Sequence, residues 1–197
     1  MSLGQLKIPL FEWKNDPNIG SKSAEYYLNL YYYKLSNNSM NNNNTNIKSK
    51  KKDSVNTKDE SIVSNLDELP FLFKERSLTS ADEEKIIKLL KKLVIFQDVS
   101  PEILSIIASE MFLLTLPEGK VVYDLNDEGN FFYIIGKGKV GVNVQESENN
   151  ILTQWHTFGE ISLFTEKKRE EVIVTKEECE LYIIDGESFR DIQKRNK

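Results

Sequence analysis

The spacing of apolar residues predicts two helices between residues 80 and 111. Ser80 followed by Glu83 is a capping-box signature, and apolar residues then recur at helical spacing. Residues 100–102 read Ser-Pro-Glu, which places an N-cap, a proline at the first helical position and an acid in the first turn. Each start signal is followed by an apolar stripe of the kind that a helix buries against a core.

After residue 111 the apolar residues alternate with polar ones, which is typical of strands. The expected strands cover residues 112–116, 120–124, 131–135, 139–144, 151–155, 171–175 and 180–184, with turns at 117–119, 126–129, 136–138 and 148–150. Seven or eight short strands at this spacing indicate a jelly roll or closed β-roll. A final helix begins near Ser188. The fold class is therefore α+β, a β-roll of about eight antiparallel strands with flanking N- and C-terminal helices.

Residues 1–79 are interpreted as an N-terminal extension of the domain formed by residues 80–197. Residues 37–46 contain seven Asn and a lysine run follows, so the segment from about 36 to 60 is expected to be disordered. The Tyr-rich stretch at 24–35 has ragged helical spacing, and a helix and a strand remain equally open there.

Composition excludes several classes of protein. The chain has 26 Lys and Arg against 31 Asp and Glu, which disfavours a nucleic-acid binder. No apolar run approaches the roughly 18 residues that span a bilayer, and Lys7 and Pro9 stand where a signal peptide needs apolar residues. The expectation is a cytoplasmic protein with no membrane insertion. One cysteine argues against a disulfide framework and a Cys-based zinc cluster, and one histidine argues against a site built from two or three His ligands. No metal and no resident cofactor are expected.

One segment, residues 158–163, breaks the strand pattern with the sequence FGEISL. Gly159 allows close backbone approach, and one helical turn after it would present free N–H groups. Glu160 can accept hydrogen bonds from hydroxyls, and Arg169 supplies a planar fork suited to a phosphate. Together these features describe a site for a sugar phosphate.

The same residues resemble the cyclic nucleotide-binding domain family, over about residues 82–195. FGEISL followed by Arg169 is similar to the family's phosphate-binding cassette. Further matches in the expected order are Pro117-Glu118-Gly119, Asp127-Glu128-Gly129, Phe132-Tyr133-Ile134-Ile135, Gly138-Lys139-Val140, Leu181-Tyr182-Ile183-Ile184-Asp185 and Phe189.

The resemblance implies a role for each matched residue of the site. Glu160 would bind the ribose 2′-hydroxyl, and Arg169 would pair with the cyclic phosphate. The other candidates are backbone N–H donors near Gly159, Ile161 and Ser162, and the side chains of Val140 or Val142 on the base side. The implied function is a regulatory module that binds cyclic AMP or cyclic GMP and is not an enzyme.

Glu170 and Glu171 depart from the family, whose nucleotide-binding members usually have Ala, Thr or Ser after the arginine. A carboxylate beside the phosphate would oppose Arg169 at a cost on the order of 1–3 kcal/mol. The alternative is therefore a degenerate fold that acts as a protein-interaction module without ligand, in which Arg169 would pair only with Glu160.

The implied output is a shift of the flanking helices, which Phe189 and Ile192 would transmit to an unidentified effector protein or domain such as a kinase. Cyclic AMP is the favoured ligand, because the Thr or Ser that often favours cyclic GMP is missing after Arg169.

Two further residues are expected to be structural. Cys179 is expected to be a buried thiol, and Trp155 is expected to pack in the core.

Overall fold

The computed structural model describes residues 7–13, 22–41, 71–77, 79–144, 147–165 and 167–195. The helices are α1 (Ala24–Asn41), α2 (Ser80–Leu90), α3 (Pro101–Glu110) and α4 (Gly186–Arg195), with short 3-10 helices η2 (Val94–Phe96) and η3 (Glu160–Leu163). The strands are β1 (Lys7–Trp13), β2 (Phe71–Ser77), β3 (Phe112–Leu116), β4 (Val121–Tyr123), β5 (Phe131–Lys137), β6 (Lys139–Val144), β7 (Ser147–Thr153), β8 (Thr157–Phe158), β9 (Val172–Thr175) and β10 (Cys179–Asp185).

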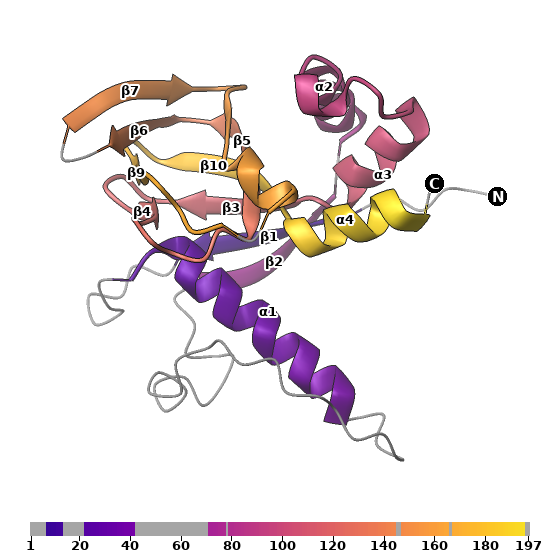
Figure 1. The fold of residues 1–197 in the computed structure, drawn as a ribbon, viewed down its shortest axis with the longest axis horizontal. Helices are drawn as coiled ribbons and strands as arrows, with labels where there is room; N and C mark the ends of the chain where they lie inside the picture. The colour runs from indigo at the N-terminus through magenta and orange to yellow at the C-terminus, as the bar shows by residue number, and fades with distance from the viewer. Residues whose placement is uncertain are drawn as a thin grey trace.

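Strands β3 to β10 form an antiparallel roll of two sheets, with helices at both ends (Figure 1). The larger sheet has the order β2-β1-β3-β10-β5-β8, and the smaller has the order β4-β9-β6-β7. Helix α3 is capped by Ser100, as the sequence predicted, but the N-cap of α2 is Thr79 and not Ser80. The Thr79 side chain accepts from the N–H of Asp82, and Ser80 is the first residue of the helix. The predicted α+β roll with flanking helices is therefore confirmed.

The core consists of two clusters that share the larger sheet. The inner cluster lies between the sheets and comprises Ala24, Leu28, Phe112, Leu114, Leu116, Val122, Tyr123, Phe131, Tyr133, Ile135, Val140, Phe158, Ile173, Cys179, Leu181 and Ile183. The helical cluster lies on the opposite face and comprises Ile86, Leu90, Phe96, Leu104, Ile107, Ala108, Met111, Leu113, Phe132, Ile134, Leu163, Tyr182, Ile184, Phe189 and Ile192. Successive residues of a strand point to opposite faces, so β5 supplies both clusters and its first five residues are all buried.

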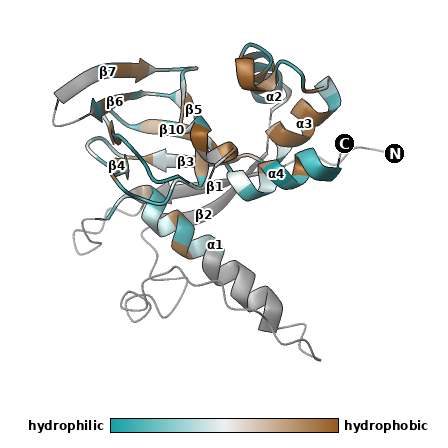
Figure 2. Ribbon diagram, viewed as in Figure 1, coloured by the Kyte–Doolittle hydropathy of each residue, from teal (hydrophilic) through white to brown (hydrophobic). Residues whose placement is uncertain are grey.

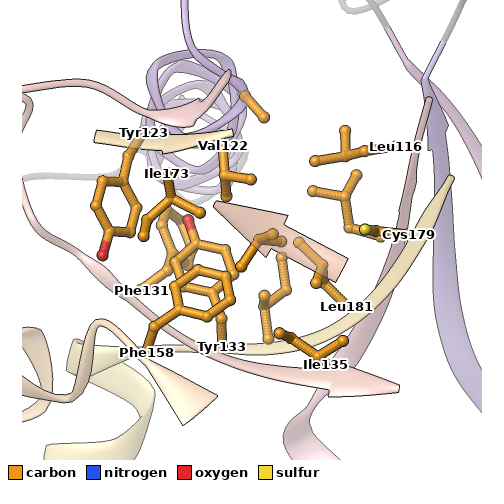
Figure 3. Packing of buried hydrophobic residues seen from close by; sticks show 14 of the residues in the cluster. Leu116, Val122, Tyr123, Phe131, Tyr133, Ile135, Phe158, Ile173, Cys179 and Leu181 are labelled. Carbon is orange, nitrogen blue, oxygen red and sulfur yellow. The ribbon is translucent and has the colours of Figure 1, made fainter. Parts of the chain in front are cut away.

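Aromatic rings fill one end of the inner cluster. Figure 3 shows the rings of Tyr133 and Phe158 lying against each other, with Cys179 beside Leu116 at the opposite end. The two rings are stacked, with their centroids 4.7 Å apart. A stacked pair of rings stabilises the core beyond the burial of apolar area and also favours one relative orientation of the two side chains.

Helix α1 docks on the roll through residues spaced four apart. Ala24 and Leu28 are fully buried in the inner cluster, and the ring of Tyr32 lies 5.8 Å from Phe112 and 5.6 Å from Phe131. This spacing places one helical stripe against the sheets. The Tyr-rich stretch, for which the sequence left helix and strand open, is thus a helix.

Helix α1 continues to Asn41, so the expectation of disorder is wrong for residues 36–41. Extending an existing helix requires no new nucleus, and the docked first turns supply that nucleus. In Figure 1 the far end of α1 extends beyond the roll. The remainder of the Asn/Lys-rich segment, residues 42–60, lies outside the described residues.

The extension also supplies two strands. Strand β1 pairs antiparallel with β2 and parallel with β3, so both strands continue the larger sheet. The described parts of the extension therefore pack on the domain that follows them. The boundary near residue 80 stays a prediction.

Local departures from the expected pattern have identifiable causes. The turn expected at residues 148–150 is part of β7, because Asn150 pairs with Val142 and Glu148 pairs with Asn143. Asn126 and Trp155 both have left-handed backbone angles, with φ of 66° and 69°. Asn tolerates that conformation, whereas Trp155 adopts it while packing partly against the helical cluster.

Most of α4 is hydrophilic (Figure 2), and the buried Phe189 and Ile192 supply its contacts with the helical cluster. Across the described residues, no helix combines the length and the apolar character needed to cross a bilayer.

We predict that Leu28→Ala lowers the free energy of unfolding by about 2–4 kcal/mol, because it leaves a cavity between α1 and the sheets. Leu125→Ala is the matched control, since Leu125 is 53% exposed and its truncation should have little effect. Chemical denaturation of the two variants checks this. Equal, small losses would contradict the docking of α1.

Candidate functional site

A pocket of about 220 Å³ opens beside η3. It is lined by Tyr123, Gly159, Glu160, Ile161, Lys167, Lys168, Arg169, Glu170 and Glu171. The fold thus brings together the cassette glycine, the acid, the arginine and the glutamate after it, as the sequence predicted for a shared site.

Two of the sequence candidates, Val140 and Val142, do not line this pocket. Val140 is fully buried in the inner cluster, and Val142 packs partly against it. Ser162 lies within η3, but its side chain is not among those described. Whether these residues contact a ligand stays a prediction.

The turn that begins the cassette depends on Gly159. Its φ is 75°, and a Cβ at this position would lie 2.8 Å from the carbonyl oxygen of Phe131 and 2.9 Å from Nη1 of Arg169. Only glycine combines this left-handed backbone with such close neighbours. The glycine therefore lets the arginine lie directly against the start of η3.

Arg169 is fixed by its backbone and by ring contacts. Its N–H donates to the carbonyl of Asp127 and its own carbonyl accepts from the N–H of Asn126, both at 2.9 Å. The guanidinium lies 4.1 Å from the centroid of the Tyr123 ring, a favourable cation–π distance. The side chain is 6% exposed, yet it still lines the pocket.

The carboxylate partner of Arg169 is Glu25 of helix α1. Nε donates to Oε2 at 2.9 Å and Nη2 donates to Oε1 at 2.6 Å, which forms a bidentate pair. Glu25 is fully buried, and its Oε1 also accepts from the N–H groups of Asn130 and Phe131. Among the described residues the pairing of Arg169 with Glu160, expected for a degenerate cassette, does not form, and Glu160 is exposed.

Sequence reasoning missed Glu25 because the two partners are 144 positions apart. The residue sits beside the apolar stripe of α1, and an acid next to a buried stripe is usually solvated. No spacing or motif connects it to the cassette.

Burial and pairing together set the electrostatics of this pair. Burial opposes the charge of Arg169, but Glu25 more than offsets this, so the pKa of the guanidinium is raised above its ordinary value. Burial raises the pKa of the Glu25 carboxyl, and Arg169 and the N–H groups of Asn130 and Phe131 partly offset that rise. The arginine therefore stays charged.

Among the residues that the structure describes, the lining of the pocket carries balanced charge. Its lining includes three carboxylates, from Glu160, Glu170 and Glu171, against the cations Lys167, Lys168 and Arg169. Burial raises the pKa of Tyr123 far above its ordinary value, so its phenol stays protonated and donates to Oε1 of Glu171 at 2.7 Å. This bond orients one of the two glutamates that depart from the family pattern.

Cys179 has a structural position away from the pocket. It is fully buried in the inner cluster, and burial raises the pKa of its thiol. Its Sγ donates to the carbonyl of Lys139 at 3.2 Å. The expectation of a buried thiol is confirmed.

We predict that Gly159→Ala destabilises the fold more than Gly119→Ala by about 1–3 kcal/mol, because only the first methyl meets close neighbours. Both glycines have φ of 75°, and a Cβ at Gly119 would meet nothing within 4 Å. The difference between the two variants therefore isolates the contact with Arg169 and Phe131. Equal losses in chemical denaturation would show that these neighbours move aside freely.

Comparisons with known proteins agree with this fold. Residues 113–196 match the family model of the cyclic nucleotide-binding domain. The fold is similar to a cyclic nucleotide-binding-like protein from Brucella abortus, with 23% identity, a TM-score of 0.52, and coverage of 56% of this chain and 98% of that one.

A second similar structure is a triple mutant of the regulatory subunit of a cAMP-independent protein kinase A from Trypanosoma brucei, with cAMP bound in its A site. It shares 18% identity at a TM-score of 0.54, and the alignment covers 59% of this chain and 44% of that one. This chain therefore matches less than half of that protein's length. The part of this chain that carries the cassette, residues 113–196, is thus the part that matches the cyclic nucleotide-binding domain family.

Proposed function

We propose that the chain is a regulatory module that binds a cyclic nucleotide in the pocket beside η3. The observation that carries this proposal is the position of Arg169, which is buried yet lines the pocket next to Gly159 and Glu160. An arginine N–H is directed to the cyclic phosphate, and Glu160, which is exposed, accepts a hydrogen bond from the ribose 2′-hydroxyl. Backbone N–H groups of Gly159, Ile161 and Ser162 complete the phosphate contacts.

Binding is expected to be weak. The described lining of the pocket has three carboxylates and three cations, so its net charge gives little attraction for an anion. From Asp82 to Lys197 the chain has 15 Lys and Arg against 22 Asp and Glu, and this acidic surface does not steer an anion inward. Affinity must come from short-range hydrogen bonds.

Cyclic AMP is the proposed ligand in preference to cyclic GMP. The residue after Arg169 is Glu170, whereas a Thr or Ser at this position often favours cyclic GMP in the family. A carboxylate cannot donate the hydrogen bond that a hydroxyl would supply there.

The signal is transmitted through η3 to helix α4. Leu163, the last residue of η3, is buried in the helical cluster, and the ring of Phe164 lies 5.7 Å from that of Phe189 on α4. A ligand that binds better when the cassette closes shifts the equilibrium toward the matching position of α4. An effector protein or domain, such as a kinase in the cytoplasm, responds to the position of α4.

The proposed role is regulatory and does not include catalysis. We predict that incubation with cyclic AMP or cyclic GMP yields no AMP or GMP, because Ser162 has no base placed by the cassette motif to activate it. Chromatography of the nucleotides after incubation checks this. Product that scales with protein concentration and disappears in Glu160→Gln would contradict it.

We predict that Glu170→Ala tightens cyclic AMP binding by about three- to tenfold, because removal of an exposed carboxylate from the pocket lining relieves partly screened repulsion. Glu118→Ala is the matched control, since it removes the same charge from an exposed residue that does not line the pocket. Arg169→Lys is expected to weaken binding at least about tenfold, since lysine lacks the planar fork.

Lysine is preferred to alanine at residue 169, because alanine would leave the Glu25 carboxylate buried without a cation, at about 3–5 kcal/mol. Isothermal titration with cyclic AMP and cyclic GMP at one ionic strength measures all four proteins. If neither wild type nor Glu170→Ala binds at millimolar ligand, the proposal fails and an interaction module without ligand remains.

A further inference from the structure

Glu25 holds one particular edge of the Arg169 guanidinium. It takes the edge formed by Nε and Nη2, and the second hydrogen of Nη2 goes to the carbonyl of Phe131 at 2.6 Å. Nη1 is directed to Gly159, whose carbonyl oxygen lies 3.5 Å away. Nη1 thus faces the cassette turn while the opposite edge is fully engaged.

The carboxylate lies behind the arginine with respect to the pocket. Arg169 lines the pocket, whereas Glu25 does not line it and is fully buried. A side chain that competed with a ligand would occupy the pocket itself. Glu25 therefore leaves the place of the ligand open and fixes the guanidinium from the far side.

Glu25 is itself held rigidly. The N–H groups of Asn130 and Phe131, at the start of β5, donate to its Oε1 at 3.0 and 3.1 Å. With the two bonds from Arg169, the carboxylate accepts four hydrogen bonds. A fully satisfied buried network of this kind has one well-defined geometry.

We infer that Glu25 is a positioning residue for the nucleotide site, which directs Nη1 of Arg169 toward the phosphate of the ligand. This inference rests on the proposed function. It adds to the site a residue from α1, which lies outside the segment 113–196 that matches the family. The binding site of this chain is thus built from two parts that are far apart in sequence.

Further contacts of α1 and of Ser23, the residue before it, reach the loop that holds the Arg169 backbone. Ser23 Oγ donates to Oδ2 of Asp127 at 2.5 Å, and Asn29 Oδ1 accepts from Nδ2 of Asn130 at 2.9 Å. Because coupling between two equilibria is reciprocal, a ligand that engages Arg169 also strengthens the docking of α1.

The test is titration of the full chain with cyclic AMP, comparing wild type, Glu25→Gln and Asn29→Ala. Glutamine keeps the shape but removes the charge and one acceptor, so affinity should fall about 10- to 100-fold, as when outer partners of metal ligands are removed. Asn29→Ala is the matched control, because it weakens the docking of α1 but leaves the ion pair. Its affinity should stay within about threefold of wild type.

A second readout follows Arg169 directly, without ligand. The Nε–H signal of Arg169 in 15N-arginine NMR is assigned by its loss in Arg169→Lys. It should exchange slowly with water in wild type and Asn29→Ala, and be lost in Glu25→Gln. Circular dichroism reports whether each variant is folded.

If Glu25→Gln fails to fold, Glu25→Asp replaces it. Aspartate keeps the charge, but its side chain is too short to accept hydrogen bonds from both Nε and Nη2 of Arg169. It should still lose about tenfold in affinity. Unchanged affinity in a folded Glu25 variant overturns the inference while the proposed function stands, and tighter binding identifies Glu25 as a competitor instead. No binding by wild type overturns the proposed function and, with it, this inference.

Discussion

The buried ion pair between Arg169 and Glu25 joins the elements that surround the arginine of the pocket. It connects helix α1, the start of β5 and the cassette turn at Gly159 within one set of hydrogen bonds. Burying two charges costs several kcal/mol per ion, so such a pair contributes little net stability but strongly disfavours any arrangement that separates its partners. Its main effect is to specify where α1 lies and how the arginine points.

The larger sheet makes this arrangement possible because it is covered on both faces. Alternate residues of β5 belong to the inner cluster and to the helical cluster, so this one strand is packed on both of its faces. The cassette turn follows β8, which pairs with β5 through Phe158 and Tyr133. Leu163 then enters the helical cluster that also contains Phe189 of α4. The pocket is therefore connected to both layers of the core through short and well-packed steps.

Sequence reasoning recovers the parts of this structure that depend on local signals. Alternating apolar residues locate most strands of the roll, the capping residues locate α2 and α3, and the FGEISL segment with Arg169 locates the pocket. It fails where long-range pairing overrides local preference. Glu148 and Asn150 read as part of a turn but belong to β7, because β6 pairs with them. Glu25 could not be connected to Arg169, because charge and spacing do not encode a contact across 144 residues.

The parallel pairing of β1 with β3 has a consequence for how the roll meets other molecules. Strand β3 would otherwise be the outermost strand of the larger sheet, with unpaired N–H and C=O groups that invite a strand from another chain. With β1 and β2 in place, the outermost strand is β2, whose sequence contains the consecutive charged residues Lys74, Glu75 and Arg76. Charged side chains on an edge disfavour further strand addition. Strands β1 and β2 thus cover the edge of β3 and leave a charged strand as the boundary of the sheet on this side.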